Sequence, residues 1–125
     1  MEKNQEEIER EVRYILSKHL GKENPVSRWE LVERVFGRDA AANRGNNNPF
    51  DRQIREIIEK YRVDDLIVSS SNGAGYWLAV NQAEVDIIAD EFEKRSKNML
   101  DKASKLRRRA IEKFGPQMEL FGKSN

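Results

Sequence analysis

Cysteine is absent from this sequence of 125 residues, and histidine occurs once, as His19. Without thiols the chain can form neither disulfides nor thiolate metal sites, and this composition fits a reducing cytoplasm. No glycine-rich phosphate loop follows a strand pattern, and no nucleophile stands beside a base. We therefore expect no enzyme activity, no catalytic residue, no metal ion and no cofactor.

Long apolar runs are absent too. No segment approaches the ~20 residues of a membrane-spanning helix, and the amino-terminal stretch MEKNQEEIEREV is too acidic for a signal peptide. Apolar residues make up 38% of the chain and charged residues 36%, which is enough for one small core and much solvated helix surface. We expect a cytoplasmic protein without membrane contact, built as one domain with an appendage.

The stretch from residue 48 to residue 79 carries the clearest pattern. Asn48 is a good helix N-cap, and Pro49 suits the first helical position. Apolar residues at helical spacing predict one buried stripe: Ile54, Ile57, Ile58 and Tyr61. The other side carries Arg52, Arg55, Glu56 and Glu59, with Gln53 at the flank.

A hairpin pattern follows directly. Leu66–Val68 is expected to form a strand, residues 71–75 a glycine turn and Tyr76–Leu78 the return strand. A helix with a hairpin directly behind it predicts a recognition helix followed by a wing.

Two further helices are expected before this stretch. The first runs from about Asn4 to Leu20 and ends at a glycine. Pro25–Val26 fits an edge strand of one or two residues. Ser27 and Glu30 then form a capping box for a second helix that ends near Phe36.

The connection between this second helix and Asn48 is long, polar and nearly devoid of core-forming residues. Loops of this length are usually mobile or functional. Arg38 and Arg44, together with the asparagines around them, suit contacts with phosphates or base edges, whereas a tolerated surface insertion explains the loop equally well.

After the hairpin, Asn81 is a third N-cap, and no glycine or proline interrupts the chain from Gln82 to Phe114. A helix over this range would be roughly 50 Å long. Its second half outruns so small a domain, so we expect homodimerisation through this helix. The apolar stripe that suggests this comprises Val85, Ile88, Phe92, Met99, Ala103, Leu106 and Ala110.

Charge is unevenly distributed. The whole chain has a net charge of +1, but residues 94–113 contain nine Lys/Arg against Asp101 and Glu112, a local balance of +7. Such runs are usually solvated helix faces. Beside a candidate DNA-binding helix, we favour a supporting role for this run in phosphate binding.

Double-stranded DNA is the partner that the 48–79 pattern favours. Side chains near the amino end of a recognition helix reach bases in the major groove, where arginine pairs with guanine and glutamine with adenine. Glu56, Glu59 and a wing without Lys or Arg argue against DNA and keep a protein-interaction domain as an alternative. The candidate DNA contacts are Arg44, Asn48, Arg52, Gln53, Arg55, Asn72 and Gly73.

The span from Val26 to Ala79 resembles the winged helix-turn-helix superfamily. Within it, the chain looks like small winged-helix proteins carried by phages and other bacterial mobile elements. The residues that carry this resemblance are Asp51-Arg52, Ile54-Arg55, Ser69-Ser70-Ser71 and Gly75-Tyr76. The family implies DNA binding in replication or its regulation. The long asparagine-rich loop departs from compact members.

The carboxyl-terminal tail carries a second resemblance. Residues 117–121 look like the pentapeptide with which bacterial replication and repair proteins bind the sliding clamp. Leu120 and Phe121 would fill an apolar pocket, Gln117 would bond at its rim, and Met118 would adapt to the groove. Packing of the tail against the protein itself remains the alternative.

The sequence thus predicts a mainly α protein with a small β-hairpin. Its expected parts are a winged helix-turn-helix domain (1–80), a long carboxyl-terminal helix (81–114) and an exposed tail (115–125). The leading hypothesis is a non-enzymatic DNA-binding protein of a bacterial mobile element, acting in replication or its control, with the sliding clamp as a second candidate partner. The alternatives are a dimeric transcriptional regulator and an adaptor that does not touch DNA.

Overall fold

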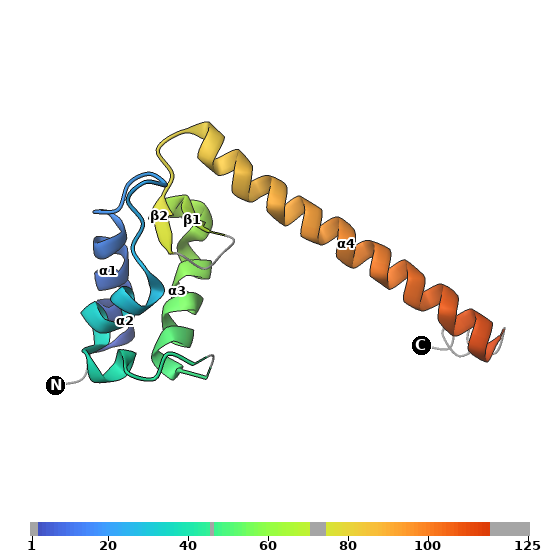
Figure 1. Cartoon of the computed structure of the whole chain (residues 1–125), viewed down its shortest axis with the longest axis horizontal. Helices are drawn as coiled ribbons and strands as arrows, with labels where there is room; N and C mark the ends of the chain where they lie inside the picture. Colours follow the sequence, from blue (N-terminus) through green and yellow to red (C-terminus); the bar gives the residue numbers. More distant parts are fainter. Residues whose placement is uncertain (1–2, 46, 71–74, 116–125) are drawn as a thin grey trace. The chain divides into compact units, whose positions relative to one another are not determined.

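The computed structural model describes residues 3–45, 47–70 and 75–115. It confirms a mainly α chain with a small two-stranded hairpin and a long carboxyl-terminal helix. The chain divides into two compact units, residues 1–88 and 89–125, and the division falls within the last helix. The elements in order are α1 (Gln5–Leu16), α2 (Arg28–Phe36), the 3-10 helix η1 (Asp39–Ala41), α3 (Pro49–Asp65), β1 (Ile67–Ser69), β2 (Tyr76–Leu78) and α4 (Gln82–Phe114) (Figure 1).

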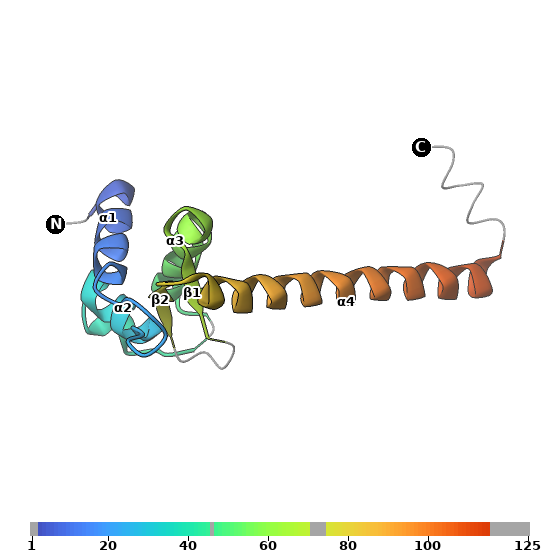
Figure 2. The same ribbon diagram turned by 90° about the horizontal axis from the view of Figure 1, so that it is seen from above.

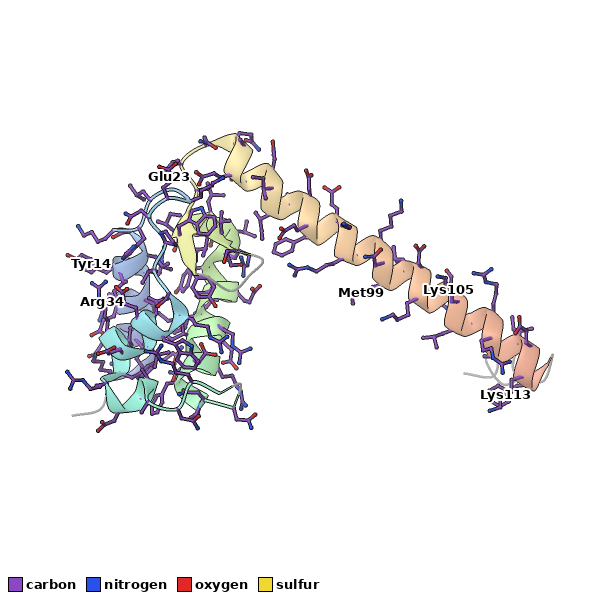
Figure 3. The ribbon with its side chains drawn as sticks, viewed as in Figure 1. Tyr14, Glu23, Arg34, Met99, Lys105 and Lys113 are labelled. Carbon is purple, nitrogen blue, oxygen red and sulfur yellow. The ribbon has the colours of Figure 1, made fainter. Side chains whose placement is uncertain are left out.

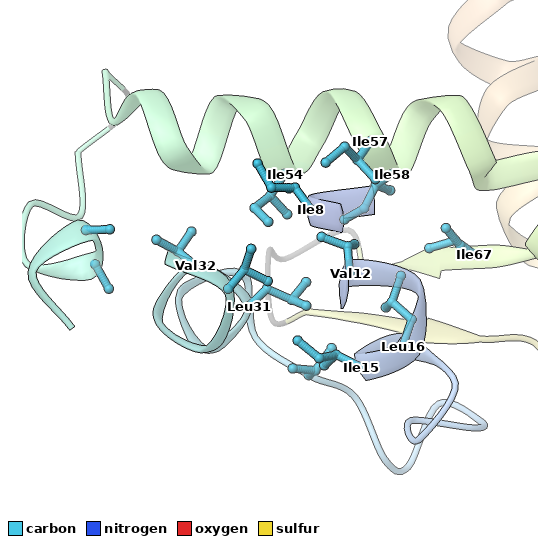
Figure 4. Close-up of a cluster of buried hydrophobic side chains, with 14 residues drawn as sticks. Ile8, Val12, Ile15, Leu16, Leu31, Val32, Ile54, Ile57, Ile58 and Ile67 are labelled. Atoms are coloured by element: carbon cyan, nitrogen blue, oxygen red, sulfur yellow. The ribbon is translucent and has the colours of Figure 1, made fainter. Parts of the chain in front are cut away.

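The core of the first unit lies where α1, α2 and α3 meet. Figure 4 shows the side chains of these helices converging, with β1 at the edge of the cluster. The stripe expected on α3 is confirmed for its three isoleucines. The fully buried members include Val12, Leu16, Leu31, Val32, Ile54 and Ile58.

The first helix is shorter than expected. α1 ends at Leu16 rather than Leu20, and Leu20 is 55% exposed. The segment after α1 pairs with β2: the Leu78 amide donates to His19 O, and the Gly21 amide donates to Leu78 O, both at 2.9 Å. Pairing with a strand satisfies these backbone groups, so the helix does not need to continue.

The hairpin is antiparallel, with Val68 opposite Trp77, and it lies beside the carboxyl-terminal part of α3 (Figures 1 and 2). Its first strand begins one residue later than expected, because Leu66 takes a left-handed conformation (φ 56°) and caps α3. The expected edge residue is confirmed, since Val26 and Tyr76 exchange two backbone hydrogen bonds of 2.9 Å.

Glycine is required at position 75 by this edge pairing. Gly75 has φ +152°, and a Cβ there would lie 2.4 Å from the Val26 carbonyl oxygen. Any side chain would therefore push the edge residue away from the hairpin.

Part of the connection between α2 and α3 is packed, although the sequence predicted a segment nearly devoid of core-forming residues. Residues 37–39, 42–45 and 47 are exposed. η1 buries Ala40 and Ala41 against the core. Asn48, only 3% exposed, accepts from the amides of Phe50 and Asp51 and donates to the carbonyls of Ala40 and Asn43. Small alanines can enter a core without forming any periodic pattern, so their burial could not be predicted from the local sequence.

α4 has the bounds expected from the sequence, and its first turn is fixed to the hairpin. Glu84 is capped by Asn81, and its carboxylate accepts from the Trp77 indole at 3.1 Å. Ile88 packs with Val68 and Trp77 in a second, smaller cluster. Among the described residues, none of the helices, α4 included, combines the length and apolar character needed to cross a membrane.

Candidate nucleic-acid interface

Asp51 organises the start of α3. It is fully buried, and the Arg28 guanidinium donates to both its carboxylate oxygens, at 3.1 and 2.9 Å. Arg55, one turn further along α3, brings its Nε within 3.1 Å of the same carboxylate. The Arg28 guanidinium also stacks over the Trp29 ring. A carboxylate in the first turn suits the helix dipole, and two arginines compensate its burial.

Arg62 joins the other end of α3 to the hairpin. Its guanidinium donates to the Ile67 carbonyl (3.2 Å) and the Ser69 hydroxyl (3.3 Å), and it also pairs with Glu59. Only 13% of the Arg62 side chain is exposed. Glu59, which in the sequence argued against DNA binding, therefore helps to hold the arginine that contacts the hairpin.

A cleft of about 370 Å³ lies between α3 and the hairpin. Burial and the nearby Asp51 carboxylate raise the pKa of the Tyr76 phenol above its ordinary value. Three guanidinium groups and several hydroxyls line the cleft, and each of the three arginines also contacts a carboxylate of the protein. Its polar lining comprises Arg28, Arg55, Glu59, Arg62, Ser69, Ser70 and Tyr76.

The three residues of α3 that were predicted to contact DNA bases do not all lie on the same exposed surface. Arg52 is exposed, and no ion pair holds it within the described part of the chain. Arg55 is half-exposed despite its contact with Asp51. Gln53, in contrast, is partly buried and donates to Gln5 on α1 at 3.1 Å. Two of the three candidate base contacts are thus presented together, and the third is turned toward α1.

The remaining candidates occupy other places. Arg44 is exposed in the loop before α3. Asn48 uses both amide hydrogens and its oxygen inside the protein, so any DNA contact by this side chain would require those bonds to break. Six further candidates lie outside the described residues: Asn72, Gly73, Gln117, Met118, Leu120 and Phe121.

Sequence reasoning missed Arg28, Arg62 and Tyr76 as parts of the cleft. Arg28 and Asp51 are 23 residues apart, and nothing in the local pattern of either links them. Arg62 is basic in the last turn of α3, which by itself indicates only a favourable position in the helix dipole.

A second charged cluster joins α1 to α3. Glu9 accepts hydrogen bonds from Tyr61, Gln5 and Lys60, and these bonds lower the pKa of its carboxyl from 4.5 to about 2. Arg13 pairs with Asp65, both bonds being 2.8 Å. These groups satisfy one another between two helices, which is the arrangement of a structural network rather than of a site awaiting a ligand.

No known protein family, characterised protein or solved structure matches this chain.

Proposed function

We propose that residues 1–88 act as a winged helix-turn-helix module that binds double-stranded DNA. The observation that carries the proposal is the cleft between α3 and the hairpin, whose lining includes Arg28, Arg55 and Arg62. The element order supports it: three helices precede a hairpin, and Val26, between the first two, pairs with β2 as an edge residue.

In this proposal α3 enters the major groove. Arg52 and Arg55 lie in its amino-terminal half, the part of a recognition helix that reaches base edges. Asp51 holds Arg55 in place before binding, so less side-chain freedom is lost in the complex, although part of its charge is neutralised. The cleft behind α3 suits a phosphate, because three guanidinium groups line it and Arg55, the most exposed of them, meets Asp51 through its Nε.

Replication or its control in a bacterial mobile element is the biological role that we propose. This rests on the resemblance of the 26–79 segment and on the tail pentapeptide at residues 117–121. A chain that binds DNA through one segment and the sliding clamp through another would bring both to one place. Removal of residues 117–125 should abolish clamp binding and leave DNA affinity unchanged; loss of neither activity would exclude the clamp role.

Fluorescence anisotropy of a labelled mixed-sequence duplex, titrated with full-length protein across salt concentrations, tests the DNA proposal. We expect affinity to fall steeply with salt, because bound phosphates release counterions. Arg52→Ala/Arg55→Ala should weaken binding on the order of tenfold or more and flatten the salt dependence. The matched control is Arg10→Ala/Lys18→Ala, which removes two exposed cations from the α1 side.

Equal binding by both double variants would exclude α3 as the contact element. No binding at low salt would favour an adaptor instead, for which the exposed Glu56 on α3 is the supporting feature. Strong preference for a palindromic duplex would favour a dimeric transcriptional regulator, since operator symmetry mirrors the two-fold symmetry of a dimer.

A further inference from the structure

Small side chains recur at every seventh position along α4. They are Ala89, Ser96, Ala103 and Ala110, and a larger apolar residue stands three places after each of the first three. We call these seven residues the α4 seam: Ala89, Phe92, Ser96, Met99, Ala103, Leu106 and Ala110. Spacings of three and four place all seven along one side of the helix.

Two large members of the seam are poorly covered within the chain. Met99 is 70% exposed and Leu106 66% exposed. Figure 3 shows side chains, Met99 among them, standing out along α4. Apolar residues repeated at this spacing along an exposed helix are typical of a contact with another helix.

The alternation of small and large residues distinguishes the two ways in which a second α4 could pair. In a parallel pair, each layer contains the same residue twice, so Ala103 would face Ala103 and Met99 would face Met99. Thin and thick layers would then alternate, leaving voids beside crowded contacts. In an antiparallel pair, a small residue of one copy faces a large residue of the other in every layer.

One antiparallel register pairs six of the seven seam residues with one another and places Ala110 opposite Val85. Phe92 faces Ala103 of the second copy, Met99 faces Ser96, and Leu106 faces Ala89. The two-fold axis then lies between residues 97 and 98. Every contact occurs twice, as the symmetry of an isologous dimer requires.

Charge favours the same register. Residues 82–93 contain five acidic residues and no Lys or Arg, a balance of −5. Residues 102–113 contain six Lys/Arg and Glu112, a balance of +5. This register places residues 82–93 of one copy opposite residues 102–113 of the other, whereas a parallel pair would place like against like.

We propose that α4 pairs with the α4 of a second copy in the antiparallel orientation, through the α4 seam. The unfavourable contact is near the centre, where Arg95 of one copy approaches Lys102 of the other. Both side chains are exposed, so water and salt screen this repulsion, and Arg95 already lies 3.8 Å from Glu91.

Electron paramagnetic resonance distance measurement tests the orientation without DNA. The chain has no native cysteine, so Glu112→Cys carries a single spin label per copy of the full-length protein. The antiparallel register predicts a label separation of about 45 Å, from 1.5 Å per residue. A separation of about 20 Å or less would show a parallel pair, and the absence of a dipolar signal would show a monomer; either result overturns the proposal.

Two matched aspartate variants test the seam itself. Leu106→Asp places a charge within the seam and should weaken dimerisation at least 100-fold in analytical ultracentrifugation. Ser104→Asp adds the same charge two residues away, outside the seam, and should change the dimerisation constant less than threefold. An equal effect of the two variants would contradict the proposed face. Should Leu106→Asp lose helix by circular dichroism, the label distance in the intact seam still decides the orientation.

Discussion

The two compact units differ in what their ion pairs connect. In residues 1–88, three ion pairs join different helices: Arg13 with Asp65, Arg28 with Asp51, and Lys60 with Glu9, all at 3.0 Å or less. Others in this unit stay within α2 or α3. In residues 89–114, the ion pairs among the described residues stay within one helix, at 3.7 and 3.8 Å. Charge in the first unit therefore ties helices to one another, whereas the ion pairs described in the second lie within α4 alone.

The largest expected contrast concerns the core. Ile54→Ala removes a fully buried side chain and should lower the free energy of unfolding by about 3 to 4 kcal/mol. Ile111→Ala removes the same atoms from an exposed position and should change it by less than about 0.5 kcal/mol. Chemical denaturation followed by tryptophan fluorescence reports on the first unit, which contains both tryptophans. Similar losses of unfolding free energy in the two variants would contradict the distinction between a packed first unit and an exposed second unit.

A second contrast concerns carboxylates. Asp51→Asn leaves two arginines beside a buried neutral group. We expect it to lower the free energy of unfolding by about 3 kcal/mol. This is the low end for a broken buried ion pair, because both arginines reach solvent. Asp101→Asn, on the exposed surface of α4, should leave the same unfolding curve unchanged. A stable Asp51→Asn variant would mean that the arginine cleft does not depend on this residue.

A smaller effect is expected where α4 begins. Glu84→Gln replaces a charge-assisted bond to the Trp77 indole by a weaker one and should cost about 1 kcal/mol. The control Glu112→Gln lies near the other end of α4 and should not alter tryptophan emission. Unchanged tryptophan emission and unchanged stability in Glu84→Gln would show that the bond from Glu84 to Trp77 does not help to hold the first turns of α4 against the hairpin.

The last expected contrast depends on pH. The pKa of Glu9 falls from 4.5 to about 2 on folding, so its contribution to stability is fully present above pH 4.5. That contribution is lost progressively as the pH falls from 4.5 toward 2. Denaturation curves of wild type and Glu9→Gln should therefore differ most near neutral pH and converge in acid. A difference in stability between the two proteins that stays constant over this pH range would contradict the lowered pKa of Glu9.

Local patterns predicted most of the helices. The caps at Asn48 and Asn81 and the 3.6-residue spacing of the isoleucines are contained within a few residues, so α3 and α4 could be placed from sequence. The end of α1 could not, because it depends on pairing of residues 19–21 with β2, more than fifty residues away. The burial of Ala40 and Ala41 likewise depends on tertiary packing.

The candidate site was only partly predictable for the same reason. Helical spacing placed Arg52 and Arg55 on an exposed side, which the structure confirms for both. It could not show that Asp51 binds Arg28, that Gln53 turns to Gln5, or that Glu59 supports Arg62. The partners of these long side chains depend on which residues the folded chain brings close to them.

The most direct test of the central claim is to map where DNA touches the protein. Nuclear magnetic resonance of the 15N-labelled protein, titrated with a short duplex, follows the backbone amides one by one. We expect the largest shifts at residues 50–56 of α3 and at Ser69 and Ser70 beside the cleft, with little change on the outer side of α1. Shifts confined to α1, or none at saturating duplex and low salt, would contradict DNA binding through α3 and the hairpin.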